Sequence, residues 1–82
     1  MIKKIYTVYD KQAQTTQPIY EAVNDLVAIR DFSMLCKNDK VEMIRKFPED
    51  YCLISLGELD TETGTITPYA KTIAEAKEYV TE

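Results

Sequence analysis

A short apolar run that ends in glycine, YCLISLG over residues 51–57, constrains the fold of this chain more than any other segment. Its length suits a buried strand and is far below the ~20 residues that cross a bilayer. The polar segment LDTETGTI follows, and its Gly64 can take the positive φ that a hairpin loop requires. TITPY, at residues 65–69, then reads as the returning strand. The middle of the sequence therefore predicts a β-hairpin.

The amino-terminal region predicts a second hairpin. Residues 2–9, IKKIYTVY, alternate and are rich in β-branched and aromatic side chains, which favours a strand. A polar loop follows over residues 10–16, and residues 17–23 favour another strand. Pro18 lacks an N–H donor, so this strand is expected at an edge of the sheet.

Two helices are expected between the hairpins, and a third after them. Asn24 can cap a helix whose apolar stripe runs to Cys36, and VEMIRKF predicts a shorter helix that Pro48 ends. TIAE resembles a capping box, with Thr72 as N-cap and Glu75 three residues later, and predicts a helix over residues 73–80. The expected fold class is α+β, in the order ββααββα. A small antiparallel sheet of two hairpins and about four strands would carry two or three helices packed on one face. At 82 residues the chain is expected to form a single domain, 1–82.

The composition argues against several classes of function. The chain contains no histidine, two cysteines and two glycines, so it offers no His base for a thiol, no zinc ligand set and no phosphate-binding glycine loop. We expect no enzyme, no cofactor and no metal, and two reduced cysteines that pack in the core. No apolar run is long enough for a membrane span, and the first residues alternate instead of forming a signal core. The sequence therefore predicts a cytoplasmic protein without a membrane partner.

Two groups of acidic residues are candidate sites. Glu58, Asp60 and Glu62 could share one strand face and hold a divalent cation, but the spacing fails the calcium-loop pattern. A solvated hairpin tip explains them better. Glu49 and Asp50 could form an acid/base pair, but the preceding proline favours a turn. Neither group is expected to do chemistry.

The charge is unevenly distributed along the chain. Residues 1–46 contain eight Lys and Arg against six acids, and residues 47–82 contain two Lys against eight acids, so +2 and −6 give the net −4. Candidate nucleic-acid contacts are the basic residues Lys3, Lys4, Lys37, Lys40, Arg45 and Lys46. Exposed members of the six tyrosines could stack on bases beside them, although tyrosines on strands usually pack at the core and its rim, and a protein partner is a third reading.

The chain resembles a known phage family over almost its full length. IYTVYDKQAQTTQPIYEAVNDLVAIRDF is similar to the start of the small non-structural protein of gokushoviruses, which are single-stranded DNA phages of the Microviridae. The run from Pro48 through Asp50, the apolar strand, Gly57-Glu58 and Gly64, and then ITPY, match the family's most recognisable part. Many members carry His before the proline, where this chain has Phe47, so a structural role is expected there.

The resemblance implies a context more than an activity. It implies a non-structural accessory protein that assists phage genome replication or packaging in the host cytoplasm by binding single-stranded DNA. The alternative is a protein-interaction module, either a homodimer or a binder of a phage or host protein, without contact to nucleic acid. An open edge strand near residues 18–22 and the acidic carboxy-terminal half favour that alternative.

Overall fold

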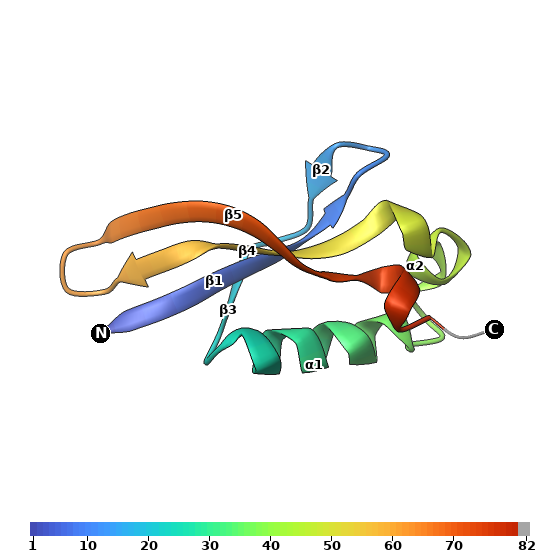
Figure 1. Cartoon of the computed structure of the whole chain (residues 1–82), viewed down its shortest axis with the longest axis horizontal. Helices are drawn as coiled ribbons and strands as arrows, with labels where there is room; N and C mark the ends of the chain where they lie inside the picture. Colours follow the sequence, from blue (N-terminus) through green and yellow to red (C-terminus); the bar gives the residue numbers. More distant parts are fainter. Residues whose placement is uncertain (81–82) are drawn as a thin grey trace.

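The computed structural model describes residues 1–80 as an antiparallel five-stranded sheet with one main helix against it (Figure 1). The strands are β1 (Ile2–Asp10), β2 (Thr15–Thr16), β3 (Tyr20–Ala22), β4 (Tyr51–Asp60) and β5 (Thr65–Glu75). The helices are α1 (Asp25–Cys36) and α2 (Glu42–Lys46), with 3₁₀ turns η1 (Pro48–Asp50) and η2 (Ala76–Glu78). The α+β class is confirmed, but the observed order is βββααββ, so the expected ββααββα order is wrong. The expected two or three helices on one face are also wrong, because α1 is the one main helix among residues 1–80, and the sheet has five strands where about four were expected. Within residues 1–80, no helix is long and apolar enough to cross a membrane.

The sheet runs in the order β2-β1-β4-β5, and β3 also pairs with β1. The single strand expected over residues 17–23 is therefore two short strands on the same side of β1, opposite Tyr9 and Tyr6 respectively. Pro18 lies in the gap between them, where it needs no N–H for pairing. The Thr7 side chain closes this gap by donating a hydrogen bond of 2.7 Å to the Gln17 carbonyl. The predicted edge position of this segment is confirmed, because β2 and β3 each pair only with β1.

Helix α1 begins and ends where the sequence predicts. The Asn24 side chain accepts a hydrogen bond of 2.9 Å from the Val27 N–H, which satisfies one of the free donors of the first turn. The apolar stripe of α1 then packs on one face of the sheet. Complete burial of a side chain such as Phe32 contributes roughly 1.5–3 kcal/mol.

The predicted central hairpin is present and is longer than expected. β4 continues past Gly57 to Asp60, and the loop closes with Gly64 at φ +74 and its N–H bonded to the Asp60 carbonyl. β5 continues beyond residues 65–69 to Glu75. Two irregularities in the pairing of β4 with β5 help the long hairpin to bend over the core.

The prediction of a carboxy-terminal helix over residues 73–80 is wrong, because β5 continues to Glu75. Thr72 pairs with Ile54, and Glu75 pairs with Cys52, so the supposed capping box belongs to a strand. Only the short turn η2 follows it. Pairing with the buried strand β4 overrides a weak local helix signal, since each β5 residue gains a ladder partner that a short terminal helix would forgo.

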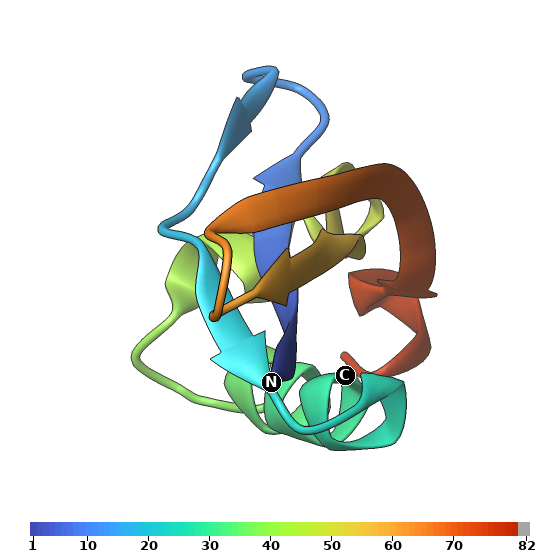
Figure 2. The same cartoon turned by 90° about the vertical axis from the view of Figure 1, so that its left-hand side faces the viewer.

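The core lies at the α1 end of the sheet, and the other end projects beyond it. The side chains of the core come mainly from the sheet, α1 and α2. The largest wholly buried ones are Tyr6, Phe32 and Leu53. Figure 2 shows the sheet end-on, with β5 curling over β4 and α1 lying below. The projecting part, named the arm here, consists of residues 2–4, 57–60 and 65–68 with the hairpin loop. The molecule measures 44 × 23 × 18 Å as a result.

Candidate nucleic-acid interface

Helix α2 has one buried residue, Ile44, and its other side chains are exposed. Ile44 is buried in the core, and Pro48 ends the helix by disfavouring helical backbone at Phe47. Met43 and Phe47 lie four residues apart and are 56% and 49% exposed. The N–H of Phe47, the C-cap residue, bonds to the Met43 carbonyl at 2.9 Å, so the carboxyl end of α2 offers an exposed apolar pair.

Four of the predicted basic residues come together at this end of the molecule. Lys37 caps α1, Lys40 lies in the turn between the helices, and Arg45 and Lys46 lie on α2. All four are exposed. Arg45 pairs with Asp39, whereas none of the ion pairs found within residues 1–80 involves the three lysines.

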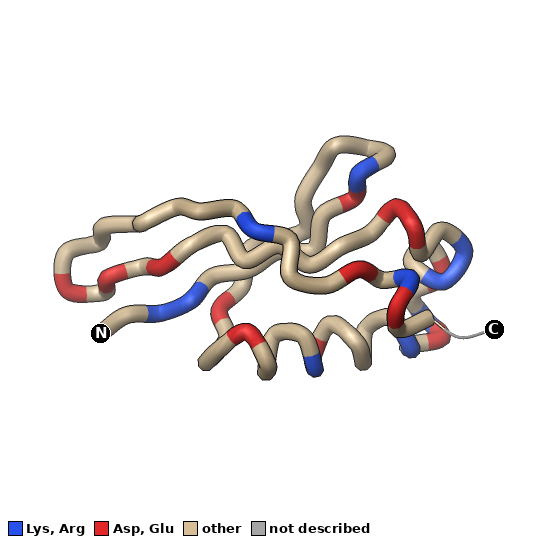
Figure 3. Tube along the Cα trace, viewed as in Figure 1, with Lys and Arg blue, Asp and Glu red and all other residues tan. Residues whose placement is uncertain are grey.

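The other two predicted residues lie far from this group. Lys3 and Lys4 lie at the beginning of β1, in the arm, whereas α2 lies at the opposite end of the long axis (Figure 1). The Lys3 ammonium pairs with the Glu21 carboxylate at 3.1 Å, and Lys4 stands opposite Glu58 in the sheet. The six residues therefore do not form one patch. Both ends carry charges of both signs (Figure 3).

The tyrosines are mainly packing residues. Tyr6 and Tyr51 are buried, and Tyr9, Tyr20 and Tyr79 are half-buried. Tyr79 stands edge-on to Phe32 in the core, with ring centroids 6.2 Å apart. The exposed aromatic side chains are Tyr69 on β5 and Phe47. Phe47, for which a structural role was predicted, is the aromatic residue beside the basic group.

A hollow of about 240 Å³ lies between α2 and the β1–β2 loop, and it is named the α2 hollow here. Its lining residues are Asp10, Gln12, Ala13, Met43, Phe47, Asp50 and Tyr51. Sequence reasoning missed it, because its walls come from three separated segments. The one available signal was the pair Phe47-Pro48, an aromatic residue at a helix stop.

Asp10 and Asp50 are the two acidic residues that line this hollow. One oxygen of Asp10 accepts the N–H groups of Gln12 and Ala13 at 3.0 and 3.1 Å, which fixes the loop. The Asp50 main chain is fixed too, because its carbonyl accepts the Lys11 N–H at 2.7 Å. Neither carboxylate belongs to an ion pair in the described part of the chain. Burial, followed by these two carboxylates, raises the pKa of Tyr51, so its hydroxyl keeps its proton at neutral pH.

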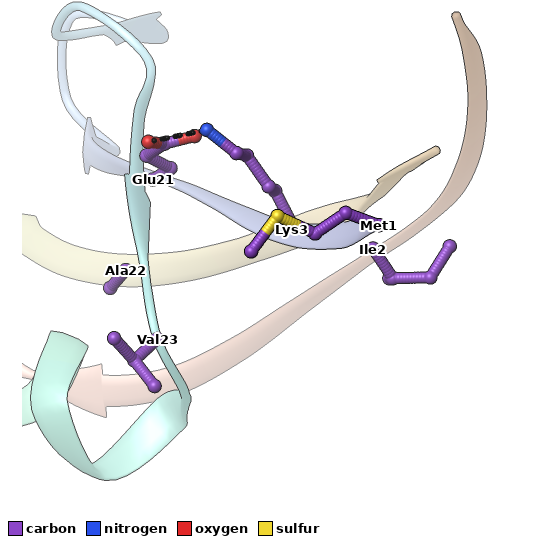
Figure 4. A pocket seen from close by; sticks show the side chains of 6 residues that line it. All are labelled: Met1, Ile2, Lys3, Glu21, Ala22 and Val23. Carbon is purple, nitrogen blue, oxygen red and sulfur yellow. Dashed lines mark hydrogen bonds and ion pairs between the residues drawn. The ribbon is translucent and has the colours of Figure 1, made fainter. Parts of the chain in front are cut away.

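A second hollow of about 340 Å³ lies in the arm, where β3 separates from β1 (Figure 4). Its lining residues are Met1, Ile2, Lys3, Glu21, Ala22 and Val23. Figure 4 shows the Lys3–Glu21 ion pair at one side of it and the Val23 side chain at the other. Leu26, in the first turn of α1, is also 77% exposed. This exposed surface, formed by the hollow and Leu26, is named the arm patch.

The remaining predicted features lie in a turn, in the central hairpin and in the core. Glu49 and Asp50 lie in the 3₁₀ turn η1, as the turn interpretation predicts. No group of three potential metal-ligating side chains occurs among residues 1–80, and Asp60 instead accepts the Glu62 N–H in the hairpin loop. Cys36 and Cys52 are free and buried, as expected, and burial raises the pKa of the Cys36 thiol to about 11. That thiol is therefore protonated at neutral pH, which makes it a poor nucleophile.

One protein-family model matches nearly the whole chain. A model of the Phage ORF5 protein family matches residues 3–79. The chain belongs to this family. The predicted phage context is confirmed at that level. No curated protein and no solved structure matches the chain.

Proposed function

We propose that this ORF5-family chain is a non-structural accessory protein of a single-stranded DNA phage of the Microviridae. In this proposal it works in the host cytoplasm, binds the single strand through the α2 end, and assists genome replication or packaging without catalysing a reaction. The phage family and the resemblance to gokushovirus proteins support the context. The observation that carries the binding role is the group of exposed lysines Lys37, Lys40 and Lys46 at the same end of the molecule as the exposed Phe47 ring.

The physical requirements of single-strand binding fit this surface. Lysine ammonium groups without carboxylate partners can replace the counterions of phosphates, which releases those ions to solution. An exposed aromatic ring can stack on any base, and such stacking contributes about 1–3 kcal/mol per base. The net charge of −4 opposes the approach of DNA, so the local group must outweigh the whole molecule at short range.

The test is fluorescence anisotropy with a labelled ~20-nucleotide single strand over a range of salt concentrations. Each phosphate contact contributes about −0.7 to the slope of log K against log salt for a single strand. Replacing Lys37, Lys40 and Lys46 by Ala should therefore reduce the slope by about 2. The matched control is the Lys3→Ala, Lys4→Ala variant, in which the removed charges lie in the arm.

Two results would contradict the proposal. Absence of binding at low salt would exclude direct contact with DNA. An equal loss of affinity in the α2 and arm variants would mean that the strand responds to total charge instead of a defined surface.

The arm patch favours a second candidate function, in which the protein is an interaction module that forms a homodimer. Four large apolar side chains are more than half exposed there, namely Met1, Ile2, Val23 and Leu26. A second copy suits this surface because the side of the hollow carries one cation and one carboxylate, Lys3 and Glu21. In a two-fold dimer each could meet its opposite on the partner. An interface of about 800 Å² per partner would use roughly a seventh of the 5614 Å² surface.

Sedimentation velocity at increasing concentration tests the dimer. The unmodified chain should sediment as a dimer at high concentration, and the Val23→Ser, Leu26→Ser variant should remain a monomer. Met34→Ser is the control, because Met34 is an exposed apolar residue elsewhere on α1. A monomer at every concentration would contradict the dimer and leave a phage or host protein as the partner.

A further inference from the structure

We propose that the α2 hollow holds one base of the bound single strand and selects guanine, through the Phe47 ring and the carboxylates of Asp10 and Asp50. This inference rests on the proposed DNA-binding function and goes beyond it, because it assigns a base preference to named residues. A surface of lysines and one aromatic ring alone would bind any sequence.

The walls of the hollow suit a flat, mostly apolar group. Met43 and Phe47 provide exposed apolar surface from α2, and Ala13 provides it from the β1–β2 loop. The loop is held in place by the two N–H bonds to Asp10, so the opposite walls are fixed by local structure. A base turned out of a single strand can enter such a space and lay its face on Phe47.

Two of the four polar residues that line the hollow are acids, Asp10 and Asp50. An ionised carboxylate only accepts hydrogen bonds. The Asp50 carboxylate makes none of the side-chain hydrogen bonds or ion pairs found among residues 1–80, whereas Asp10 already accepts two N–H groups of its own loop and interacts with the Tyr51 hydroxyl. Guanine presents two adjacent donors on its Watson–Crick edge, the ring N1–H and the 2-amino group, which can bind one carboxylate in a bidentate manner. Thymine presents a single N–H between two carbonyl oxygens, which the carboxylates would repel. Donor geometry therefore favours guanine.

The arrangement of charge around the hollow, acids inside and lysines outside, suits a nucleotide better than a basic peptide. Two acids line the hollow, whereas Lys46 precedes Phe47 and is exposed on α2, with Lys37 and Lys40 at the same end of the molecule. A nucleotide has the matching order, with N–H donors on its base and negative charge on its phosphate. An arginine side chain would match the carboxylates, but the rest of a basic peptide would meet the lysines.

Competition anisotropy with the full chain tests the inference. The competitors are a strand of about 20 dT nucleotides, the same strand with one central dG, and the same strand with deoxyinosine in place of that dG. One dG should tighten binding about tenfold relative to dT alone. Deoxyinosine lacks the 2-amino group and should lose most of this gain.

The variant that isolates the mechanism is Asp50→Asn. An amide cannot supply two acceptors to the N1–H and amino groups. The variant should therefore bind the dG-containing strand and the dT strand with about equal affinity, while its binding of dT persists or strengthens. Glu49→Gln is the matched control, since Glu49 is an exposed acid next in the chain that does not line the hollow. Circular dichroism melting of each variant verifies that it is folded.

The outcomes distinguish failure of the base site from failure of the proposed function. Salt-dependent binding with equal affinity for the dG and dT strands would overturn the base site and leave DNA binding intact. Absence of any strand binding at low salt would overturn both.

An NMR titration tests the base site directly. Amide shifts of Ala13, Phe47 and Tyr51 should appear with deoxyguanosine monophosphate. The same shifts with an acetylated Gly-Arg-Gly amide, and none with the nucleotide, would assign the hollow to a peptide and overturn the inference.

Discussion

The Tyr6 hydroxyl donates a hydrogen bond of 2.7 Å to the Asp25 carboxylate and so joins β1 to the first turn of α1. The Tyr6 side chain is wholly buried, and burial followed by this bond raises the pKa of its phenol above the usual value of 10. Tyr6→Phe should lower the free energy of unfolding by about 2 kcal/mol, because the carboxylate loses its partner. Urea unfolding at pH 7 measures the loss. Asp25→Asn, which keeps an acceptor, should cost less.

The same residue predicts how stability depends on pH. A phenol whose pKa is raised in the folded state stabilises the fold fully below about pH 10, and the contribution is lost as the pH rises towards the folded-state pKa. Cys36 acts in the same direction from about pH 9, since burial raises its pKa from 9.0 to about 11. The free energy of unfolding should fall between pH 9 and pH 11, and less steeply in Tyr6→Phe. A flat profile in the unmodified chain would contradict the buried positions of both groups.

At the scale of elements, the long hairpin depends on Gly57. A Cβ at this position would lie 2.3 Å from the Thr67 carbonyl oxygen, and the residue has φ +155. Gly57→Ala should therefore destabilise the protein by about 2 kcal/mol through a clash between β4 and β5. Gly64→Ala is the matched control, because its Cβ would meet open space and only its positive φ costs about 1 kcal/mol. Equal urea midpoints for the two variants would mean that the strands separate easily at Gly57.

The cap of α1 gives an independent test of the helix. Asn24→Ala should cost about 1 kcal/mol, because the Val27 N–H loses its acceptor. Asn24→Asp keeps an oxygen at the same place and should retain nearly full stability. Thermal unfolding compares the two. Equal losses would indicate that the amide group of Asn24 has another role.

At the scale of the whole molecule, the two ends should act independently on DNA at physiological salt. Glu58 and Glu62 lie in the arm, and the molecule is 44 Å long. The screening length is about 30 Å at 0.01 M salt and about 8 Å at 0.15 M. Glu58→Gln, Glu62→Gln should raise the affinity for a single strand at 0.01 M salt and leave it unchanged at 0.15 M. An equal gain at both concentrations would place the strand on the arm.

The positions of α1 and the central hairpin could be predicted because local chemistry decides them. Asn24 caps its own helix, Pro48 ends α2, and Gly64 closes the loop of its own hairpin. The helix expected after Thr72 failed because that segment is decided by β4, a strand more than ten residues away. A weak capping signal cannot compete with ladder pairing and burial that appear only when the sheet has formed.

The candidate site divides in the same way. The sequence by itself determined that basic residues gather near the junction of the two helices, because Lys37 to Lys46 are close along the chain. Only the tertiary structure decided that Lys3 and Lys4 lie at the opposite end, and that Asp10 and Asp50 meet Phe47 around one hollow. The physical reason is that local hydrogen bonds and steric limits act within a few residues. The hollow instead depends on strand pairing that brings residues 10 and 51 together.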